Sequence, residues 1–255
     1  RGGGERAAEE EQVDHLFAEE NTDADDLPPP AYQPQVAAFE PRQEESLEAE
    51  PDTFVAPRAP APGTPSPEAL ARLRAAGLPG RRDEYWKYTR PDTLVQDEAP
   101  HAAVFESDEA PVFDAVDRLK VVFVDGVFDA DLSDPLEGEG FSIERLADVA
   151  GMDIHWAKDL YGRLETNGQN PVKRPLAALN TAFASDGVVI RVTGRVSRPV
   201  SLIYIHKSEA SDAMLHHVIK VEEGADITLL ENGPAAARFN KVLEVDVADN
   251  AGFHH

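Results

Sequence analysis

Two pairs of adjacent histidines are the residues of this 255-residue sequence best suited to metal chemistry: His216–His217 and His254–His255. Imidazole nitrogens are common ligands for zinc, copper and iron. The run MLHHVIKV around the first pair is typical of a β-strand, in which neighbouring side chains point to opposite faces. His216 and His217 therefore cannot bind one ion together, and each is only a weak metal candidate. The same objection applies to the second pair, so we predict no metal site.

The run RRDEYWKYT at 81–89 combines charged and aromatic residues and has three interpretations. A nucleic-acid surface would pair its basic residues with phosphates and stack its aromatic rings on bases, but acids interrupt it. A catalytic carboxylate pair is disfavoured because adjacent side chains usually point apart. We prefer a structural anchor, in which aromatic rings pack inward and charges pair along the surface. The residues of this predicted anchor are Arg82, Asp83, Glu84, Trp86, Lys87 and Tyr88.

The sequence lacks the residues that most enzyme and cofactor sites require. It has no cysteine, so it offers no thiolate to zinc or to an iron–sulfur cluster, and it can form no disulfide. The absence of disulfides fits a cytoplasmic protein. Neither the phosphate-binding pattern G-x-x-x-x-G-K-[ST] nor the nucleophile pattern G-x-S-x-G occurs. We predict no catalytic residue, no bound cofactor and no enzymatic activity.

The net charge is −24, from 48 acidic and 24 basic residues. Such a chain repels nucleic acid, and it contains no apolar run of the roughly 18 residues that a membrane span needs. The stretch from Arg1 to Leu70 holds 17 of the acids, no lysine and 11 of the 20 prolines. A segment of this composition buries too little apolar surface to offset the entropy of ordering it. Residues 1–65 are therefore predicted to be a disordered, acidic, proline-rich tail.

Helical and strand patterns alternate between residues 66 and 185. The segment SPEALARLRAAGLPG predicts a helix that begins after Ser66 and ends near Gly77. The run LKVVFVDGVFD at 119–129 is apolar and β-branched around a strong turn dipeptide, Asp125–Gly126. Apolar residues at helical spacing predict two further helices, over 153–168 and over 174–187. We assign 66–185 to an N-terminal mixed helical region.

From residue 186 the pattern changes to strands alone. Five apolar runs begin near residues 188, 200, 214, 225 and 241, with glycine, aspartate or proline between them. This spacing fits either a β-sandwich or a β-solenoid in which each coil stacks on the last. Spacing by itself does not separate these two architectures.

Three stretches together resemble the SufB/SufD family, whose members belong to the SufB–SufC–SufD scaffold that assembles iron–sulfur clusters. They are GLPGRRDEYWKYTRPDTL, PLAALNTAFASDGVVIRV and HHVIKVEEGADITLLE, in that order. The first has the form typical of the SufD branch, and the lack of cysteine also disfavours the SufB branch. The resemblance covers about residues 66–255 and leaves the acidic tail outside.

The resemblance implies an α+β, mainly β fold: an N-terminal helical region followed by a right-handed parallel β-helix. We assign 186–255 to the start of that β-helix, which the sequence cuts before its end. The resemblance further implies pairing with SufB through the β-helix and docking of the SufC ATPase on a C-terminal region beyond His255. The cluster would be assembled by the complex, and this segment would bind no cofactor.

Two other functional classes fit a β-solenoid. One is a carbohydrate-active enzyme with acids in a groove, although Glu222, Glu223 and Asp226 crowd one turn instead of following successive coils. The other is a plain oligomerisation module. Co-purification with SufB and SufC, turnover of polysaccharide, or self-association alone would separate the three hypotheses.

Overall fold

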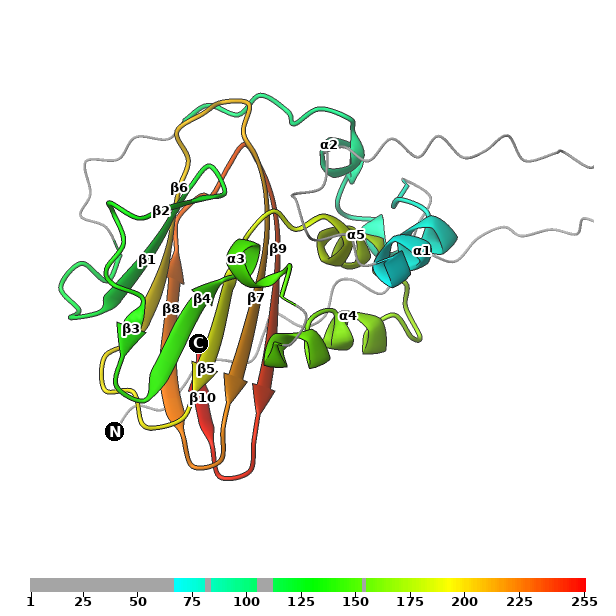
Figure 1. Ribbon diagram of the computed structural model, residues 1–255. Helices are drawn as coiled ribbons and strands as arrows, with labels where there is room; N and C mark the ends of the chain where they lie inside the picture. The colour runs from blue at the N-terminus through cyan, green and yellow to red at the C-terminus, as the bar shows by residue number, and fades with distance from the viewer. Residues whose placement is uncertain (1–66, 81–83, 105–111, 153–154) are drawn as a thin grey trace, which may run out of the picture. The chain divides into compact units, whose positions relative to one another are not determined.

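The computed structural model describes residues 67–80, 84–104, 112–152 and 155–255, all within the compact unit Asp52–His255. The predicted acidic tail, residues 1–65, lies outside the described residues. So do Arg82 and Asp83 of the predicted anchor. Within the part described, the fold is mainly strands arranged in two sheets, with short helices beside them (Figure 1).

The helices are short and precede or interrupt the strands. They are α1 (Pro67–Ala76), η1 (Glu84–Trp86), α2 (Asp92–Val95), α3 (Leu146–Val149), η2 (Trp156–Asp159), α4 (Arg163–Asn167) and α5 (Pro175–Phe183). Helix α1 confirms the helix predicted from SPEALARLRAAGLPG, and α5 confirms the one predicted from Pro175 onward. The α5 helix lies against β7 and β9, and α1 packs on α5 (Figure 1).

The single helix predicted over 153–168 is wrong. The structure has the 3-10 turn η2 followed by the five-residue helix α4, with a break at Gly162, where φ is +72°. Leu164, expected on the buried face, is 50% exposed. The apolar periodicity was misleading because a glutamate from a distant strand holds the first amides of α4, as described below.

Two five-stranded sheets form the body of the fold. One has the order β10-β8-β6-β1-β2 and the other the order β3-β4-β5-β7-β9. The strands are β1 (Leu119–Val124), β2 (Val127–Asp129), β3 (Glu137–Gly138), β4 (Phe141–Arg145), β5 (Val188–Val192), β6 (Val200–Ile205), β7 (Asp212–Val221), β8 (Asp226–Asn232), β9 (Arg238–Val247) and β10 (Gly252–His254).

From β5 onward, consecutive strands alternate between the two sheets, and each pairs in parallel with the strand two places later. Val189 of β5 pairs with Val218 of β7, and Val200 of β6 pairs with Leu229 of β8, so both sheets have the same offset in sequence between partners. The later pairs, β7 with β9 and β8 with β10, share a slightly shorter offset. The number of residues between paired strands is therefore nearly constant along the chain, and it is the same in both sheets. The predicted α+β, mainly β class is confirmed as two mixed sheets.

Four strands come from the region expected to be mixed helical, and they complete both sheets. Strands β1 and β2 form the hairpin predicted around Asp125 and Gly126, whose φ values are +50° and +80°. Strand β1 then pairs in parallel with β6, and β4 pairs antiparallel with β5. Residues 119–145 thus belong structurally with the strands that follow residue 186.

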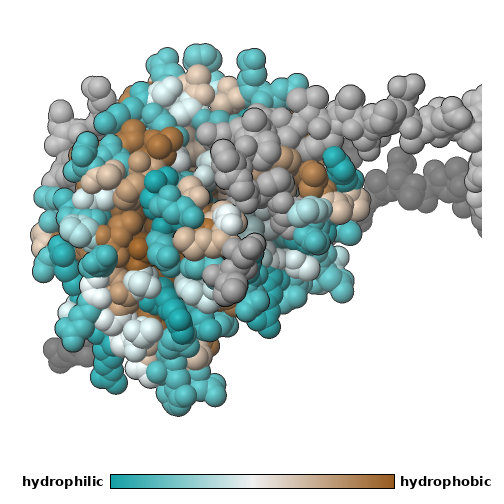
Figure 2. Space-filling view, viewed as in Figure 1, coloured by the Kyte–Doolittle hydropathy of each residue, from teal (hydrophilic) through white to brown (hydrophobic). Residues whose placement is uncertain are grey.

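The main core lies between the two sheets and is built from inward-facing aliphatic and aromatic side chains of both. Its fully buried members include Phe123, Ile190, Leu202, Leu215 and Ile227. A second cluster joins α1 to α5, through Leu73 and Leu179 among others. On the face seen in Figure 2, the described residues are mainly hydrophilic, and hydrophobic residues form small separate patches. Within the described ranges, no helix is both long and apolar enough to cross a membrane.

Two glycine substitutions test how closely the hairpin approaches β7. A Cβ at Gly126 would lie 2.4 Å from Cβ of Ala213, and one at Gly224 would meet nothing within 4 Å, although both residues have positive φ. Gly224→Ala should cost only the backbone strain of about 1 kcal/mol. Gly126→Ala adds a clash of roughly 1–3 kcal/mol. Urea unfolding of both variants measures the difference, and equal losses would contradict the close approach.

Candidate functional site

The adjacent histidines of β7 are both fully buried, and each belongs to a different polar network. His217 faces the core between the sheets, and His216 faces the helices on the outer side. This arrangement confirms the expectation that neighbours on one strand point apart. The candidate site therefore consists of two back-to-back networks on opposite faces of β7.

The inner network starts at His217, whose hydrogen bonds define its tautomer. Its Nδ1 accepts a hydrogen bond from the backbone N–H of Val188 at 3.1 Å, so the ring proton must be on Nε2. Nε2 lies 3.0 Å from the Tyr204 hydroxyl and donates to it. The Tyr204 hydroxyl in turn donates to Oε1 of Glu231 at 2.6 Å. The network is a directional chain of hydrogen bonds that crosses the core.

Glu231 is the acceptor at the other end of the inner network. Lys241 forms an ion pair with its Oε1, and Nε2 of His255 lies 2.9 Å from its Oε2. Burial raises the pKa of Glu231, but hydrogen bonds from Lys241 and Tyr204 and the charge of Lys241 outweigh that effect and hold the pKa below its ordinary value. The carboxylate is therefore ionised at neutral pH.

The environment of His217 keeps its ring uncharged. Burial is the main cause that lowers its pKa to about 3, and the nearby Glu231 opposes the shift only in part. Tyr204 also stays protonated, because burial and its hydrogen bond to Glu231 raise its pKa. The inner network is thus a neutral imidazole and a neutral phenol linked to an ionised acid.

The outer network centres on Glu244 of β9, whose side chain is 3% exposed. Its Oε2 lies 2.9 Å from Nε2 of His216, and its Oε1 accepts hydrogen bonds from the backbone N–H groups of Leu164 at 2.9 Å and Glu165 at 3.1 Å. Burial raises the pKa of Glu244, but hydrogen bonds and electrostatic attraction from His216 and the backbone bonds outweigh it and lower that pKa.

Glu244 therefore holds the start of α4 against the sheet. The backbone N–H of Gly162 also donates to its Oε2, so three amides at the beginning of the helix share one carboxylate. The Tyr161 ring lies on the His216 ring with a centroid separation of 4.2 Å, and its hydroxyl donates to the Thr181 carbonyl at 2.8 Å. These contacts join β7, β9, α4 and α5.

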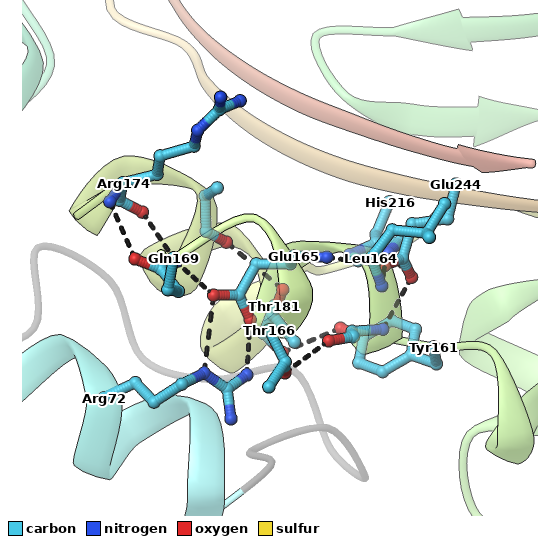
Figure 3. Close-up of polar contacts among 12 residues, drawn as sticks. Arg72, Tyr161, Leu164, Glu165, Thr166, Gln169, Arg174, Thr181, His216 and Glu244 are labelled. Atoms are coloured by element: carbon cyan, nitrogen blue, oxygen red, sulfur yellow. Dashed lines mark hydrogen bonds and ion pairs between the residues drawn. The ribbon is translucent and has the colours of Figure 1, made fainter. Parts of the chain in front are cut away.

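A second carboxylate extends this connection to α1. Glu165 is buried and forms an ion pair with Arg72, and it also accepts a hydrogen bond from Gln169 (Figure 3). The Gln169 amide oxygen accepts a hydrogen bond from the Arg174 backbone N–H at 2.7 Å. The outer network therefore runs from β9 through α4 to α1 and to Arg174, the residue immediately before α5.

The two networks offer little metal chemistry. Among the residues that the structure describes, no three His, Cys, Asp or Glu side chains are grouped to hold a metal ion. His254 and His255 also contact different acids, Asp226 at 3.5 Å and Glu231 at 2.9 Å. The arrangement suits the mechanical joining of strands and helices better than ligand binding.

The segment predicted to be a structural anchor is more exposed than expected. Tyr85 is 70% exposed and Tyr88 is 91% exposed, and Glu84 and Lys87 lie on the surface as well. Trp86 is half-buried in η1. The expectation that the aromatic rings pack inward is therefore wrong for the two tyrosines, because η1 is a single exposed turn with only one side against the protein.

Sequence reasoning missed the carboxylates and the phenol that organise both networks. A signal was present for Glu231, which follows Ile227 and Leu229 at the alternate positions that face the core. An acid at such a position predicts a buried partner. No comparable local signal marks Glu244, because its partners are backbone amides and a histidine far away in sequence. The ion-pair partner of Glu165, Arg72, is equally distant.

The comparisons with known proteins identify the family. Residues 65–202 match the family described as the SufBD protein N-terminal region, so the chain belongs to the SufBD family. It is also similar to the iron–sulfur cluster assembly protein SufD of Escherichia coli strain K12, with 26% identity over 207 residues. The match covers 74% of this chain but 45% of that relative, so the chain spans less than half of the relative's length.

Removing Glu244 should destabilise the packing of the helices against the sheet. Glu244→Ala leaves His216 and three backbone amides buried without an acceptor, so we expect a loss of roughly 3–5 kcal/mol. The matched control is Glu222→Ala, which breaks a partly exposed pair with Arg191 and should cost at most about 1 kcal/mol. Because the pKa of Glu244 is lowered by folding, its contribution is present above about pH 4.5 and is lost as the pH falls further. Urea unfolding at several pH values checks both expectations.

His217 should make the protein less stable in acid. Its pKa is about 3 when folded and 6.5 when unfolded, so the unfolded chain binds the proton first, and stability falls as the pH drops from 6.5 towards 3. The slope from this group is at most about 1.4 kcal/mol per pH unit. His217→Phe should flatten the dependence between pH 7 and pH 5, and His254→Phe, at an exposed position, should not. An unchanged slope in His217→Phe would contradict the neutral buried ring.

Proposed function

We propose that this protein is a non-catalytic scaffold subunit of SUF iron–sulfur cluster assembly. Membership of the SufBD family carries the proposal, and the similarity to SufD supports this branch over SufB. The complete absence of cysteine agrees, since cluster ligation depends mainly on thiolates. In this role the cluster is cargo, and the chain contributes shape and contacts.

The proposal includes a specific architecture. We infer that the two sheets are the first coils of a right-handed parallel β-helix. Two features support this inference: strands alternate between the sheets, and the sequence offset between paired strands is nearly constant. Strand β9 pairs with β7 along its whole length, and its other edge suits a further parallel neighbour.

The partners follow from the family. SufB would pair with the β-helix, and the SufC ATPase would supply nucleotide hydrolysis. The acidic chain would take no part in nucleic-acid or membrane binding, and the complex would work in the cytoplasm. The described residues supply rigid joints, Glu244 and Glu231, that keep the sheet surface in one shape for pairing.

Co-purification tests the scaffold role. With SufB and SufC of its own organism expressed beside it, the tagged protein should retain SufB through gel filtration. Expression without the tagged chain controls for adhesion of SufB and SufC to the column. Self-association without SufB would instead favour an oligomerisation module. Turnover of polysaccharide by the purified protein would favour the carbohydrate-active enzyme.

Anaerobic reconstitution tests the absence of a resident cluster. Purified protein incubated with iron and sulfide and then desalted should show no charge-transfer absorption in the visible region, because it has no thiolate, His216 is bonded to a carboxylate and His217 is bonded to a backbone amide. A stoichiometric cluster that survives desalting and disappears in His216→Ala or His217→Ala would show that the chain donates ligands.

A further inference from the structure

An aromatic hollow lies where η1 meets the start of α5. Tyr85 and Trp86 form one side, and residues 172–177 form the other. Its volume is about 360 Å³, and its apolar wall includes the buried Pro175 and the half-buried Leu176. Tyr85 is 70% exposed and Trp86 is half-buried, so part of each ring is open to a ligand.

The charge around this hollow is opposite in sign to that of the chain. The two segments that form it, residues 84–90 and 172–177, hold four basic residues and one acidic residue, whereas the whole sequence has 24 basic and 48 acidic residues. Lys173 and Arg174 line the hollow and are exposed, and neither forms an ion pair with another residue that the structure describes. Figure 3 shows the Arg174 side chain directed away from the carboxylate of Glu165. The rim of the hollow is therefore a small positive surface.

The side chains of the hollow are the kinds that recognise short protein segments. Tryptophan, tyrosine and arginine contribute most of the binding energy at protein interfaces. Aromatic rings cover apolar groups, and a guanidinium binds a carboxylate through two parallel hydrogen bonds. The volume lies at the small end of the range for ligand pockets, about 300–1,000 Å³. A ligand that fits must present a small apolar group to the rings and negative charge to the rim.

We propose that the aromatic hollow binds a short acidic segment of a partner protein. An aliphatic or proline residue of that segment lies against Tyr85 and Trp86, and its carboxylates pair with Lys173 and Arg174. Charge complementarity selects this ligand, because the rim is positive in a strongly negative chain.

The length of the segment follows from the size of the positive surface. The Debye length at physiological salt is about 8 Å, so a few carboxylates held at the rim are largely screened from the acids elsewhere on the chain. A long polyanion such as single-stranded nucleic acid would extend past the rim into the field of an acidic protein. The hollow therefore favours a short segment whose charge is confined to the rim.

Selection of short random peptides displayed on phage, with the full chain as bait, tests the class of ligand. The enriched peptides should carry a net negative charge around one aliphatic or proline residue. Arg174→Glu replaces a cation at the rim by an acid, so it should weaken binding of the strongest acidic peptide by about tenfold or more. Fluorescence anisotropy of the labelled peptide measures the affinity.

The matched control is Lys207→Glu, which changes the net charge by the same amount at an exposed position outside the hollow. This variant should leave the affinity within about twofold of the natural chain, because distant surface charges are screened. Failure to enrich acidic peptides, or equal binding by the natural chain and Arg174→Glu, would overturn the proposal.

Fluorescence of Trp86 shows whether the peptide occupies the hollow. The sequence has two tryptophans, so Trp156→Phe leaves Trp86 as the one reporter. The selected peptide should change its emission and saturate at the same concentration as the anisotropy signal. An emission that stays constant at saturation would place the peptide elsewhere and contradict the proposal.

Two results would assign the hollow to another occupant. Tighter binding of a labelled thymidine oligonucleotide than of the peptide, with a change in Trp86 emission, would assign it to single-stranded nucleic acid. A dimer in gel filtration that the acidic peptide dissociates would assign it to a second copy of the chain. None of these measurements needs SufB or SufC, so their outcome does not depend on the proposed scaffold function.

Discussion

The parallel hydrogen-bond ladder between β7 and β9 is the constraint on which the rest of the described structure depends. An unbroken series of pairs, from Asp212–Arg238 to Val221–Val247, fixes which residue of one strand lies beside which of the other. That register places Glu244 next to Val218, on the same outer face as His216. The inner face receives His217 and Lys241 by the same alternation. This one strand pairing sets the face on which the β7 and β9 members of both networks lie.

The two networks stabilise different parts of the fold. The inner one satisfies polar groups inside an otherwise apolar core, where an unpaired hydroxyl or imidazole would be costly. The outer network connects the sheets to the helices through two carboxylates, Glu244 and Glu165. A helix as short as α4 is not stable alone, so its position depends on these acids more than on its own sequence. The position of α4 is therefore only as rigid as the sheet that holds it.

The sequence predicted much of this fold and little of the site. Strand runs such as SLIYIH and DITLLE, and the turn at Asp125–Gly126, are local signals, and each appears where expected. The helix expected over 153–168 failed because Gly162 and the distant Glu244 override local periodicity. The adjacency of two histidines on one strand predicted that their side chains lie on opposite faces of the sheet. It did not predict their partners, Tyr204 and Glu244, which come from other strands. Such pairings depend on register, which composition and spacing do not specify.

The back-to-back histidines also bear on how β7 finds its place during folding. Sliding β7 by one residue would exchange the two rings between the faces of the sheet. His217 would then lose Tyr204 and the Val188 amide, His216 would lose Glu244, and both rings would be buried without their acceptors and donors. A strand that carried valines at both positions would face no such penalty for slipping. The two imidazoles therefore favour one alignment of β7 over the alignments shifted by a single residue.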